Sequence, residues 1–318
     1  MARFQRRDML RGCLGSSLAL GTGGWLLGPG SARAAVAPAA SIRALMLGEV
    51  FAGPLIEVEG GGVVGEVVPE QPGPDRIGHK HIGNVKYEDI KVVCGAGMAK
   101  IFWEWYEIYS APNKAPTPRS GAIVTFDEDR KFVSGRDFTD AVITELGFPA
   151  LDAAGNDAAR LTMTLRPAAV RAGAARKPPK ALLAAMRPWR VCDYRLKIGG
   201  LEAACGRVGR IGALALRRTP GSPLQVEAPD LVATLAESDA DPFFAWHEDF
   251  VVKGRNTQDR EKTGTLEYLS PEGVVLFALK LDGLGIFRVG PAKDASAGPR
   301  PVKVEMYCES MTVTASPG

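Results

Sequence analysis

The hexapeptide Phe102-Trp103-Glu104-Trp105-Tyr106-Glu107 matches a later one, Phe243-Phe244-Ala245-Trp246-His247-Glu248, at an offset of 141 in the numbering. The same offset relates Asp89-Ile90 to Asp230-Leu231. It also relates two runs of alternating side chains, residues 161–165 and 302–306. Several matching blocks in the same order indicate an internal duplication.

Between these blocks the offset changes to 143, as a short insertion balanced by a later deletion would produce. The pairs that follow it are Gly121 with Gly264, Phe138 with Leu281, Ile143 with Ile286, and Leu146-Gly147 with Val289-Gly290. The sequence therefore predicts two diverged copies of one domain.

The aromatic stretch predicts one helix in each copy. In the first copy, apolar side chains recur at the i, i+3, i+4 and i+7 spacing of one helix face between residues 98 and 109. In the second copy, Asp241 is the expected N-cap and Pro242 the first helical residue. A stripe of this kind is typical of a buried face. The residues that we expect to anchor the core are Phe102, Trp105, Phe243 and Trp246.

The remaining segments predict strands. Side chains alternate between apolar and polar over residues 302–308, and the runs 122–126 and 265–269 each follow a glycine and end in polar turns. Gly199-Gly200 predicts a tight hairpin that opens the second copy, and Gly48 predicts one in the first. The expected fold is mainly β (α+β), with two tandem β-sandwich or barrel domains, each covered by one α-helix.

The domain boundary is expected in a stretch rich in Ala, Pro and Arg. Lys177-Pro178-Pro179-Lys180 can form neither a helix nor a strand ladder, so it favours a solvated linker. The expected organisation is a first domain over residues 35–169, a linker over 170–188 and a second domain over 189–318.

The N-terminus has the parts of an export signal. The pair Arg6-Arg7 precedes an uncharged stretch, residues 12–30, which leads to the small-x-small cleavage site Ala32-Arg33-Ala34. The order predicts a Tat signal peptide over residues 1–34, cut after Ala34 and recognised by the Tat translocase. An uncut N-terminal anchor is the alternative. The mature chain is expected to lack a membrane span and to lie in the periplasm, on the cell surface or in the medium.

The charge balance does not point to a polyanion partner. The whole chain carries 39 Lys and Arg against 36 Asp and Glu, but five of these basic residues and one acidic residue lie in the signal. The expected mature chain therefore has nearly equal numbers of the two signs. Such a balance gives no indication of nucleic-acid binding.

Motifs spread over the first copy resemble the tail-tube protein family of long-tailed phages. They are Tyr87-Glu88-Asp89-Ile90, Cys94-Gly95-Ala96-Gly97-Met98, Gly121-Ala122-Ile123-Val124, residues 138–145, residues 147–153 and Leu161-Thr162. The second copy lacks the Cys-Gly-Ala-Gly element and the Phe-Pro-Ala-Leu run, and only the internal repeat relates it to the family. The resemblance implies a subunit that closes into six-membered rings, which stack into a hollow tube. Two domains per chain would let three chains form a pseudo-six-membered ring.

The sequence contains little that indicates catalysis. His79-Lys80-His81 could contribute to a zinc site, but no further ligand lies at a suitable spacing, and a solvated loop is the preferred interpretation. His247 follows the predicted core residue Trp246, which favours a structural role. We therefore expect no enzyme activity, no catalytic residue, no cofactor and no metal.

Four cysteines follow the expected cleavage site: Cys94, Cys192, Cys205 and Cys308. Cys192 and Cys205 would lie near the limit of disulfide reach across the predicted Gly199-Gly200 hairpin. Buried free thiols are the preferred interpretation, and the pairing stays open.

The favoured function is a non-enzymatic, exported structural subunit that assembles with itself into rings or tubes. The alternative is an exported monomeric binding, adhesin or adaptor module that kept the fold without polymerising, because a fold does not settle function.

Overall fold

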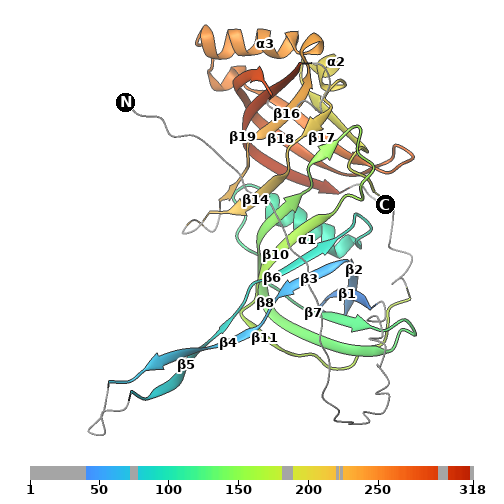
Figure 1. The fold of residues 1–318 in the computed structure, drawn as a ribbon, viewed down its shortest axis with the longest axis vertical. Helices are drawn as coiled ribbons and strands as arrows, with labels where there is room; N and C mark the ends of the chain where they lie inside the picture. The colour runs from blue at the N-terminus through green and yellow to red at the C-terminus, as the bar shows by residue number, and fades with distance from the viewer. Residues whose placement is uncertain are drawn as a thin grey trace, which may run out of the picture. The chain divides into compact units, whose positions relative to one another are not determined.

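The computed structural model describes residues 41–71, 78–180, 189–219, 222, 225–292 and 300–315. The expected signal peptide, with Arg6, Arg7, Ala32 and Ala34, lies outside the described residues. From residue 39 onward the chain forms one compact unit. We name residues 41–180 the first half and residues 189–315 the second half. The structure is mainly β, as predicted, and its sheets are antiparallel (Figure 1).

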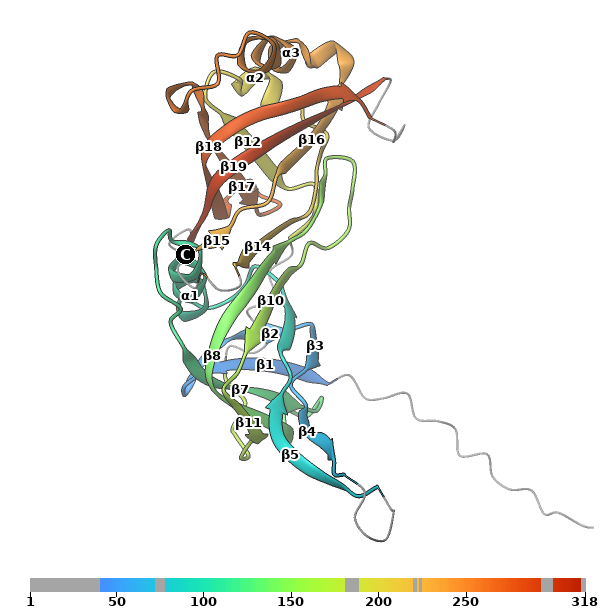
Figure 2. The ribbon, with the colours of Figure 1, turned by 90° about the vertical axis from the view of Figure 1, so that its left-hand side faces the viewer.

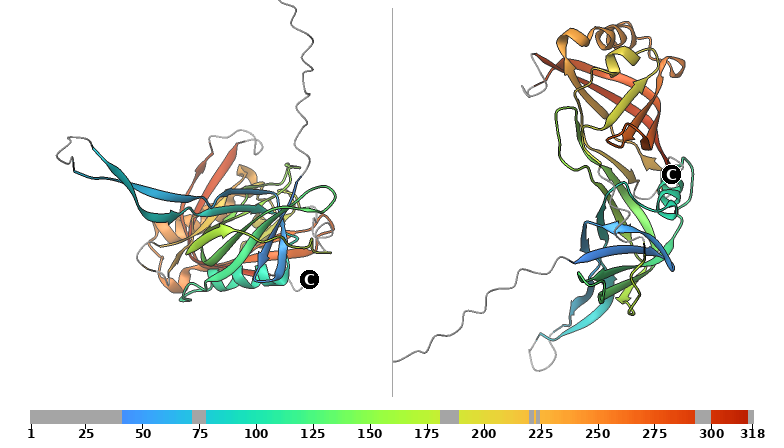
Figure 3. Two further views of the ribbon diagram at one scale, coloured as in Figure 1. Left: turned by 90° about the horizontal axis from the view of Figure 1, so that it is seen from below. Right: turned by 90° about the vertical axis from the view of Figure 1, so that its right-hand side faces the viewer.

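The main sheet of the first half has the strand order β2-β1-β7-β8-β10-β6-β3. Strand β11 pairs with β8, and β4 pairs with β5 in a separate two-stranded ribbon (Figure 3). The bounds are β1 Ile42–Leu47, β2 Val50–Leu55, β3 Glu57–Gly60, β4 Val63–Pro69, β5 Lys80–Tyr87, β6 Ile90–Cys94, α1 Lys100–Ser110, β7 Arg119–Phe126, β8 Phe132–Phe148, β9 Leu151–Asp152, β10 Leu161–Arg166 and β11 Ala169–Ala172.

The sheet of the second half has the order β12-β17-β18-β19-β16-β13-β9. Its bounds are β12 Tyr194–Ile198, α2 Glu202–Cys205, β13 Arg210–Ile211, β14 Leu214–Arg218, β15 Val226–Glu227, β16 Leu231–Ala236, α3 Asp241–His247, β17 Lys262–Leu269, β18 Val275–Pro291 and β19 Pro301–Ala315. Short 3-10 turns cover Glu237–Asp239 and Gln258–Arg260, and a π-helical turn, Glu248–Val252, extends α3.

The two halves have the same topology. The first half contains β1-β7-β8-β10-β6 and the second contains β12-β17-β18-β19-β16 in the corresponding order. The registers correspond as well. Gly121 lies opposite Phe138 as Gly264 lies opposite Leu281, and Met163 lies opposite Val92 as Val304 lies opposite Ala233. The partners are related by the same two offsets that relate the repeated motifs.

Each half also has its longest helix at the same place in the strand order, α1 between β6 and β7 and α3 between β16 and β17. The four predicted anchors lie on the inner faces of these helices. Phe102 and Phe243 are fully buried, and Trp105 and Trp246 are 2% and 8% exposed. Burial of large aromatic side chains supplies much of the energy that holds a short helix against a sheet.

The start of α3 differs from the prediction. Asp241 is not the N-cap, because it already lies in the first helical turn, and Ala240 occupies the capping position without a side-chain hydrogen bond. Pro242 is accordingly the second helical residue. An acidic residue in the first turn still interacts favourably with the positive end of the helix dipole, which explains why the pattern looked like a cap.

The predicted hairpin at Gly199-Gly200 is wrong, although Gly200 does have the positive φ of +77° that a tight turn requires. The chain enters the short helix α2 after this turn, and β12 pairs with the distant strand β17. In the first half, the expected hairpin at Gly48 forms between β1 and β2.

Two further predictions need correction. His81 lies on β5, opposite Val68 of β4, so most of the histidine segment is strand and not loop. The linker expected over residues 170–188 begins inside a strand, because β11 pairs with β8 as far as Ala172. Pairing with β8 satisfies the backbone amides and carbonyls of these residues. The Ala-rich composition gave no sign that they form a strand.

One apolar core runs through both halves. It includes side chains from the long strands of both sheets and from α1, α2 and α3. A smaller cluster lies on the other face of β1 and β7: Ala44, Met46, Ala122, Val124 and Phe126. The chain from residue 39 onward therefore packs as one body around the main core.

Replacing Trp105 or Trp246 with alanine is expected to lower the free energy of unfolding by about 3–5 kcal/mol, because each change removes a large buried side chain and leaves a cavity. Urea unfolding followed by circular dichroism measures the change. Val274→Ala is the control, since Val274 is 62% exposed. A Trp105→Ala variant as stable as this control would contradict the packing described here.

Candidate assembly interface

The second half adds a strand to the sheet of the first half. Strand β8 pairs with β7 along its first part and with β10 along its second part. Where β7 ends, β14 takes the free edge, with Leu214 opposite Phe148 and Leu216 opposite Leu146 (Figure 2). All four of these side chains are buried. Pairing of this kind satisfies the backbone groups of an edge that would otherwise be exposed.

Ion pairs mark the register of this junction. Arg217 Nε lies 2.7 Å from Glu145 Oε2, directly across the β14–β8 ladder. At a second crossing, β9 of the first half extends the second sheet through β13, where Arg210 Nη2 lies 2.8 Å from Asp152 Oδ2. All four side chains are partly exposed, so each pair contributes only about 0–1 kcal/mol. Their main effect is to disfavour a slipped register.

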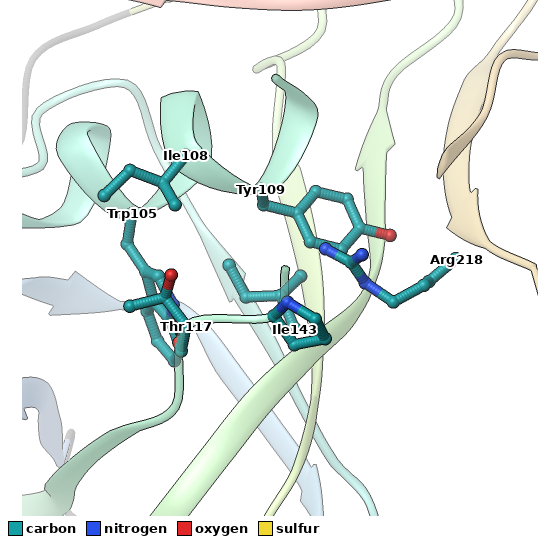
Figure 4. Close-up of a pocket in the computed structure, with 7 residues that line it drawn as sticks. Trp105, Ile108, Tyr109, Thr117, Ile143 and Arg218 are labelled. Carbon is teal, nitrogen blue, oxygen red and sulfur yellow. Dashed lines mark hydrogen bonds between the residues drawn. The ribbon is translucent and has the colours of Figure 1, made fainter. Parts of the chain in front are cut away.

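The last turn of α1 meets β14 at the same junction. The Tyr109 hydroxyl donates to the Thr144 carbonyl at 2.8 Å and lies 3.2 Å from the Leu216 carbonyl. The Arg218 guanidinium lies over the Tyr109 ring, 4.9 Å from its centre (Figure 4). Burial raises the pKa of Tyr109, so its hydroxyl stays a donor at physiological pH.

The space beside this contact is too small for a ligand. It is lined by residues from α1, the segment that follows it, β8 and β14, and its volume is about 10 Å³ (Figure 4). Such a volume corresponds to one water molecule. The elements are packed against one another here, and the space between them has no room for a larger molecule.

The same helix also binds the end of β19. The Val313 amide donates to Ser110 Oγ at 2.8 Å, and the Ala315 amide donates to Glu107 Oε1 at 2.7 Å. These two side chains satisfy edge amides of the second half from a helix of the first half.

An aromatic cluster completes the contact between the halves. Trp103 of α1 stacks on Phe277 of β18 with ring centres 4.9 Å apart, and Phe277 stacks on Tyr268 of β17 at 4.4 Å. The ring of Trp189 meets that of Phe277 edge-on, with centres 5.4 Å apart. The ring centres of Phe148 of β8 and Tyr268 are 6.0 Å apart. Aromatic pairs in these geometries add about 0.5–1.5 kcal/mol each beyond their burial.

The two tryptophans predicted to anchor the core, Trp105 and Trp246, lie in different surroundings. Trp105 donates through Nε1 to the Thr117 carbonyl at 3.0 Å and lies next to the α1–β14 joint, whereas Trp246 lies on α3 with Lys262 Nζ 5.4 Å from its ring centre. Strand β14 was missed from the sequence. The alternation of Leu214, Ala215 and Leu216 was the available signal, and it was too short to separate from a loop.

The described residues contain no cluster of three or more His, Cys, Asp or Glu side chains suited to hold a metal ion. His81 Nδ1 lies 3.0 Å from Glu70 Oε1, and both side chains are about half exposed. Among the helices of the described part, none is long and apolar enough to cross a membrane.

The four cysteines of the described residues are unpaired, with Cys192 half-buried and the other three buried. Burial raises the pKa of Cys94 to about 12, and it raises the pKa of Cys205 to about 11. It also raises the pKa of Cys308 to about 12. A buried thiol in its protonated form is inert, so these three side chains act as small apolar residues.

The described chain is therefore a β-rich module whose two topologically equivalent halves are joined by strands that pair across their antiparallel sheets. The family resemblance seen in the first copy is confirmed: residues 53–170 match the family model described as T4-like virus tail tube protein gp19. The match covers most of the first half and none of the second.

Solved structures give weaker likenesses. The tube-terminating cap of the anti-feeding prophage is 18% identical, with 43% of this chain and 90% of that chain covered and a TM-score of 0.37. A chain of the sheath–tube complex of an extracellular contractile injection system is 20% identical, with 45% and 94% covered and a TM-score of 0.37. Neither is similar enough to transfer an assembly to this chain. No curated protein sequence matches it.

Replacing Ser110 with alanine is expected to destabilise the chain by about 1–3 kcal/mol, because the buried Val313 amide would lose its acceptor. Urea unfolding measures the loss, and Ser134→Ala at an exposed position of β8 is the matched control. Since one core joins both halves, the loss should shift a single transition. Separate unfolding of the two halves would contradict the joint.

Thiol labelling of the folded protein at pH 8 is expected to modify Cys192 and to leave Cys94, Cys205 and Cys308 unmodified. The raised pKa values keep these three thiols protonated until pH rises through about 11–12, and burial blocks the reagent. Mass spectrometry after labelling locates the modified residue, and labelling in urea is the control for full reactivity. Rapid native labelling of Cys94 would show that β6 is not buried as described.

Proposed function

We propose that this chain is a non-enzymatic structural subunit that is exported and assembles with itself into rings or tubes. The observation that carries the proposal is the strand addition of β14 onto β8, made between two halves of equivalent topology. A duplicated domain that docks one copy onto the other in this way has the parts needed for repeated head-to-tail association. The family match of residues 53–170 supports a tail-tube type of subunit.

The division into domains is part of the proposal. We infer that the halves arose by duplication of one tube-type domain, because their strand order and registers correspond along with the repeated motifs. Three chains would then supply six domain equivalents to one ring. Such a ring of three two-domain chains would resemble a tail-tube ring of six single-domain subunits.

Export is proposed from the N-terminal sequence alone. The Arg6-Arg7 pair and the Ala32-Arg33-Ala34 site support passage through the Tat translocase, which carries folded proteins and so suits a compact β module. The destination would be the periplasm, the cell surface or the medium. Phage tail tubes assemble in the cytoplasm, and an exported tube-type protein would therefore be a tail-derived component put to another use.

The test is electron microscopy of the chain from Ala35 onward, together with mass photometry over a range of concentrations. Rings or tubes with three-fold or pseudo-six-fold symmetry are the expected result, since each chain would contribute two equivalent positions. Monomers at every concentration would overturn the proposal and favour the exported binding or adaptor module. Export is tested separately by replacing Arg6 and Arg7 with lysine, which should retain the chain in the cytoplasm.

A further inference from the structure

The ribbon of β4 and β5 occupies the same topological position as β14 and β15. In the first half, β3 pairs with β6 and leads into β4, as β13 pairs with β16 and leads into β14 in the second. The registers agree as well. Val64 lies opposite Lys86 on β5, and Arg217 lies opposite Glu227 on β15, where Glu227 is related to Lys86 by the offset of 141. Strand β4 is therefore the counterpart of the strand that docks on β8 within the chain.

Strand β18 is likewise the counterpart of β8. Both strands have 17 residues, and both continue beyond the neighbour that pairs with their first part, β7 or β17. In β8, residues 145–148 receive β14 on that edge. Their counterparts in β18, residues 288–291, pair with β19 on one side, and no described strand pairs with them on the other. Among the described residues, the second half thus has an unpaired acceptor edge where the first half has a filled one.

Exposed apolar side chains lie on both of the unused surfaces. On the donor strand β4, Val63 and Val64 are 57% and 46% exposed, whereas their counterparts on β14 lie against β8. Next to the acceptor edge of β18, Phe287 is 43% exposed. Exposed apolar residues that gather on matching surfaces are typical of an interface.

The helices repeat this pattern. Trp103 and Ser110 of α1 contact the second half within the chain, at Phe277 and Val313. The residues that correspond to them in the second copy are Phe244 and Val251, which are exposed on α3 and its π-helical extension. Beside the counterpart of Phe277 in the first half, Val133 of β8 is also exposed. Positions that contact the other half in α1 thus have no described partner in α3.

We propose that the second half of one chain docks on the first half of a second copy, and that the contact repeats the one already made within the chain. The start of strand β4 of the second copy pairs antiparallel with residues 288–289 of β18, with Val63 opposite Val289 and Val64 opposite Arg288. Phe244 and Val251 of α3 pack near Val133 of that copy. The occupant of these surfaces is a second copy because the intrachain contact already shows that the two kinds of edge fit one another.

The register follows from the intrachain pairing of Leu216 with Leu146 and of Arg217 with Glu145. The ion pair of the intrachain junction is replaced by a contact between Val64 and the aliphatic part of Arg288. The contact is head-to-tail, since one copy offers its second half and the other its first. Repetition therefore closes into a ring or continues as a filament.

Cysteine cross-linking tests the register. Val64→Cys and Arg288→Cys are made in separate chains, each also carrying Cys192→Ser, and the two proteins are mixed and oxidised. Directly opposed residues of an antiparallel pair lie within disulfide reach, so a disulfide-linked dimer of the two variants is expected. Val67→Cys with Arg288→Cys is the matched control, because Val67 is an exposed valine of the same ribbon about 10 Å further along. Equal cross-linking of the control pair would overturn the proposed register.

A second variant tests the helix contact. Phe244→Asp is expected to abolish assembly, because it places a charge in the apolar contact, while Val274→Asp at an exposed site outside it leaves assembly unchanged. Circular dichroism shows that each variant is folded. Assembly that survives Phe244→Asp would overturn the docking surface.

The inference rests on the proposed function, and the two can fail separately. The unaltered protein is first scored by mass photometry. If it stays monomeric at all concentrations, both the proposed function and the docking surface fail. If it forms rings but Val64 does not cross-link to Arg288, only the docking surface fails.

Discussion

The open edge of a long strand is the constraint on which the rest of this structure depends. Strands β8 and β18 each have 17 residues, while β7 and β17, which pair with their first parts, have 8. The remaining length of each long strand extends past this neighbour, so its backbone amides and carbonyls on that side need another strand to pair with. Unpaired edges attract other strands, so a fold built on them must fill each edge or use it. The first half fills its edge with β14.

Covalent connection favours the pairing of β14 with the edge of β8. Because β14 belongs to the same chain, it docks at a high effective concentration and does not lose the freedom of a separate molecule. The α1–β19 hydrogen bonds and the Trp103–Phe277 stack lie around this junction. The halves consequently share one core and act as one body, although each has the strand order of a complete sheet.

The sequence was sufficient for the frame of the fold, because the two offsets of the internal repeat correspond to real strand registers. The helix faces were equally readable, since Phe102 and Trp105 repeat at helical spacing. Strand β14 and the joint at Tyr109 could not be read in this way. Their positions depend on tertiary pairing with β8, and a five-residue strand or a single hydroxyl has no periodicity of its own. Gly199-Gly200 misled for the same reason, since a turn does not specify the partner of the strand before it.

The two halves differ at equivalent helix positions in a way that matches their different surroundings. Ser110 and Glu107 of α1 accept hydrogen bonds from amides at the end of β19, and polar side chains are required there because those amides are fixed within the chain. At the equivalent place in the second copy, Val251 is apolar and exposed. A contact between molecules can be stabilised by apolar burial alone. A joint within one chain that buries backbone amides must also give each amide a hydrogen-bond acceptor. The difference between Ser110 and Val251 is thus the one expected if the first joint is permanent and the second forms only in the docking proposed above.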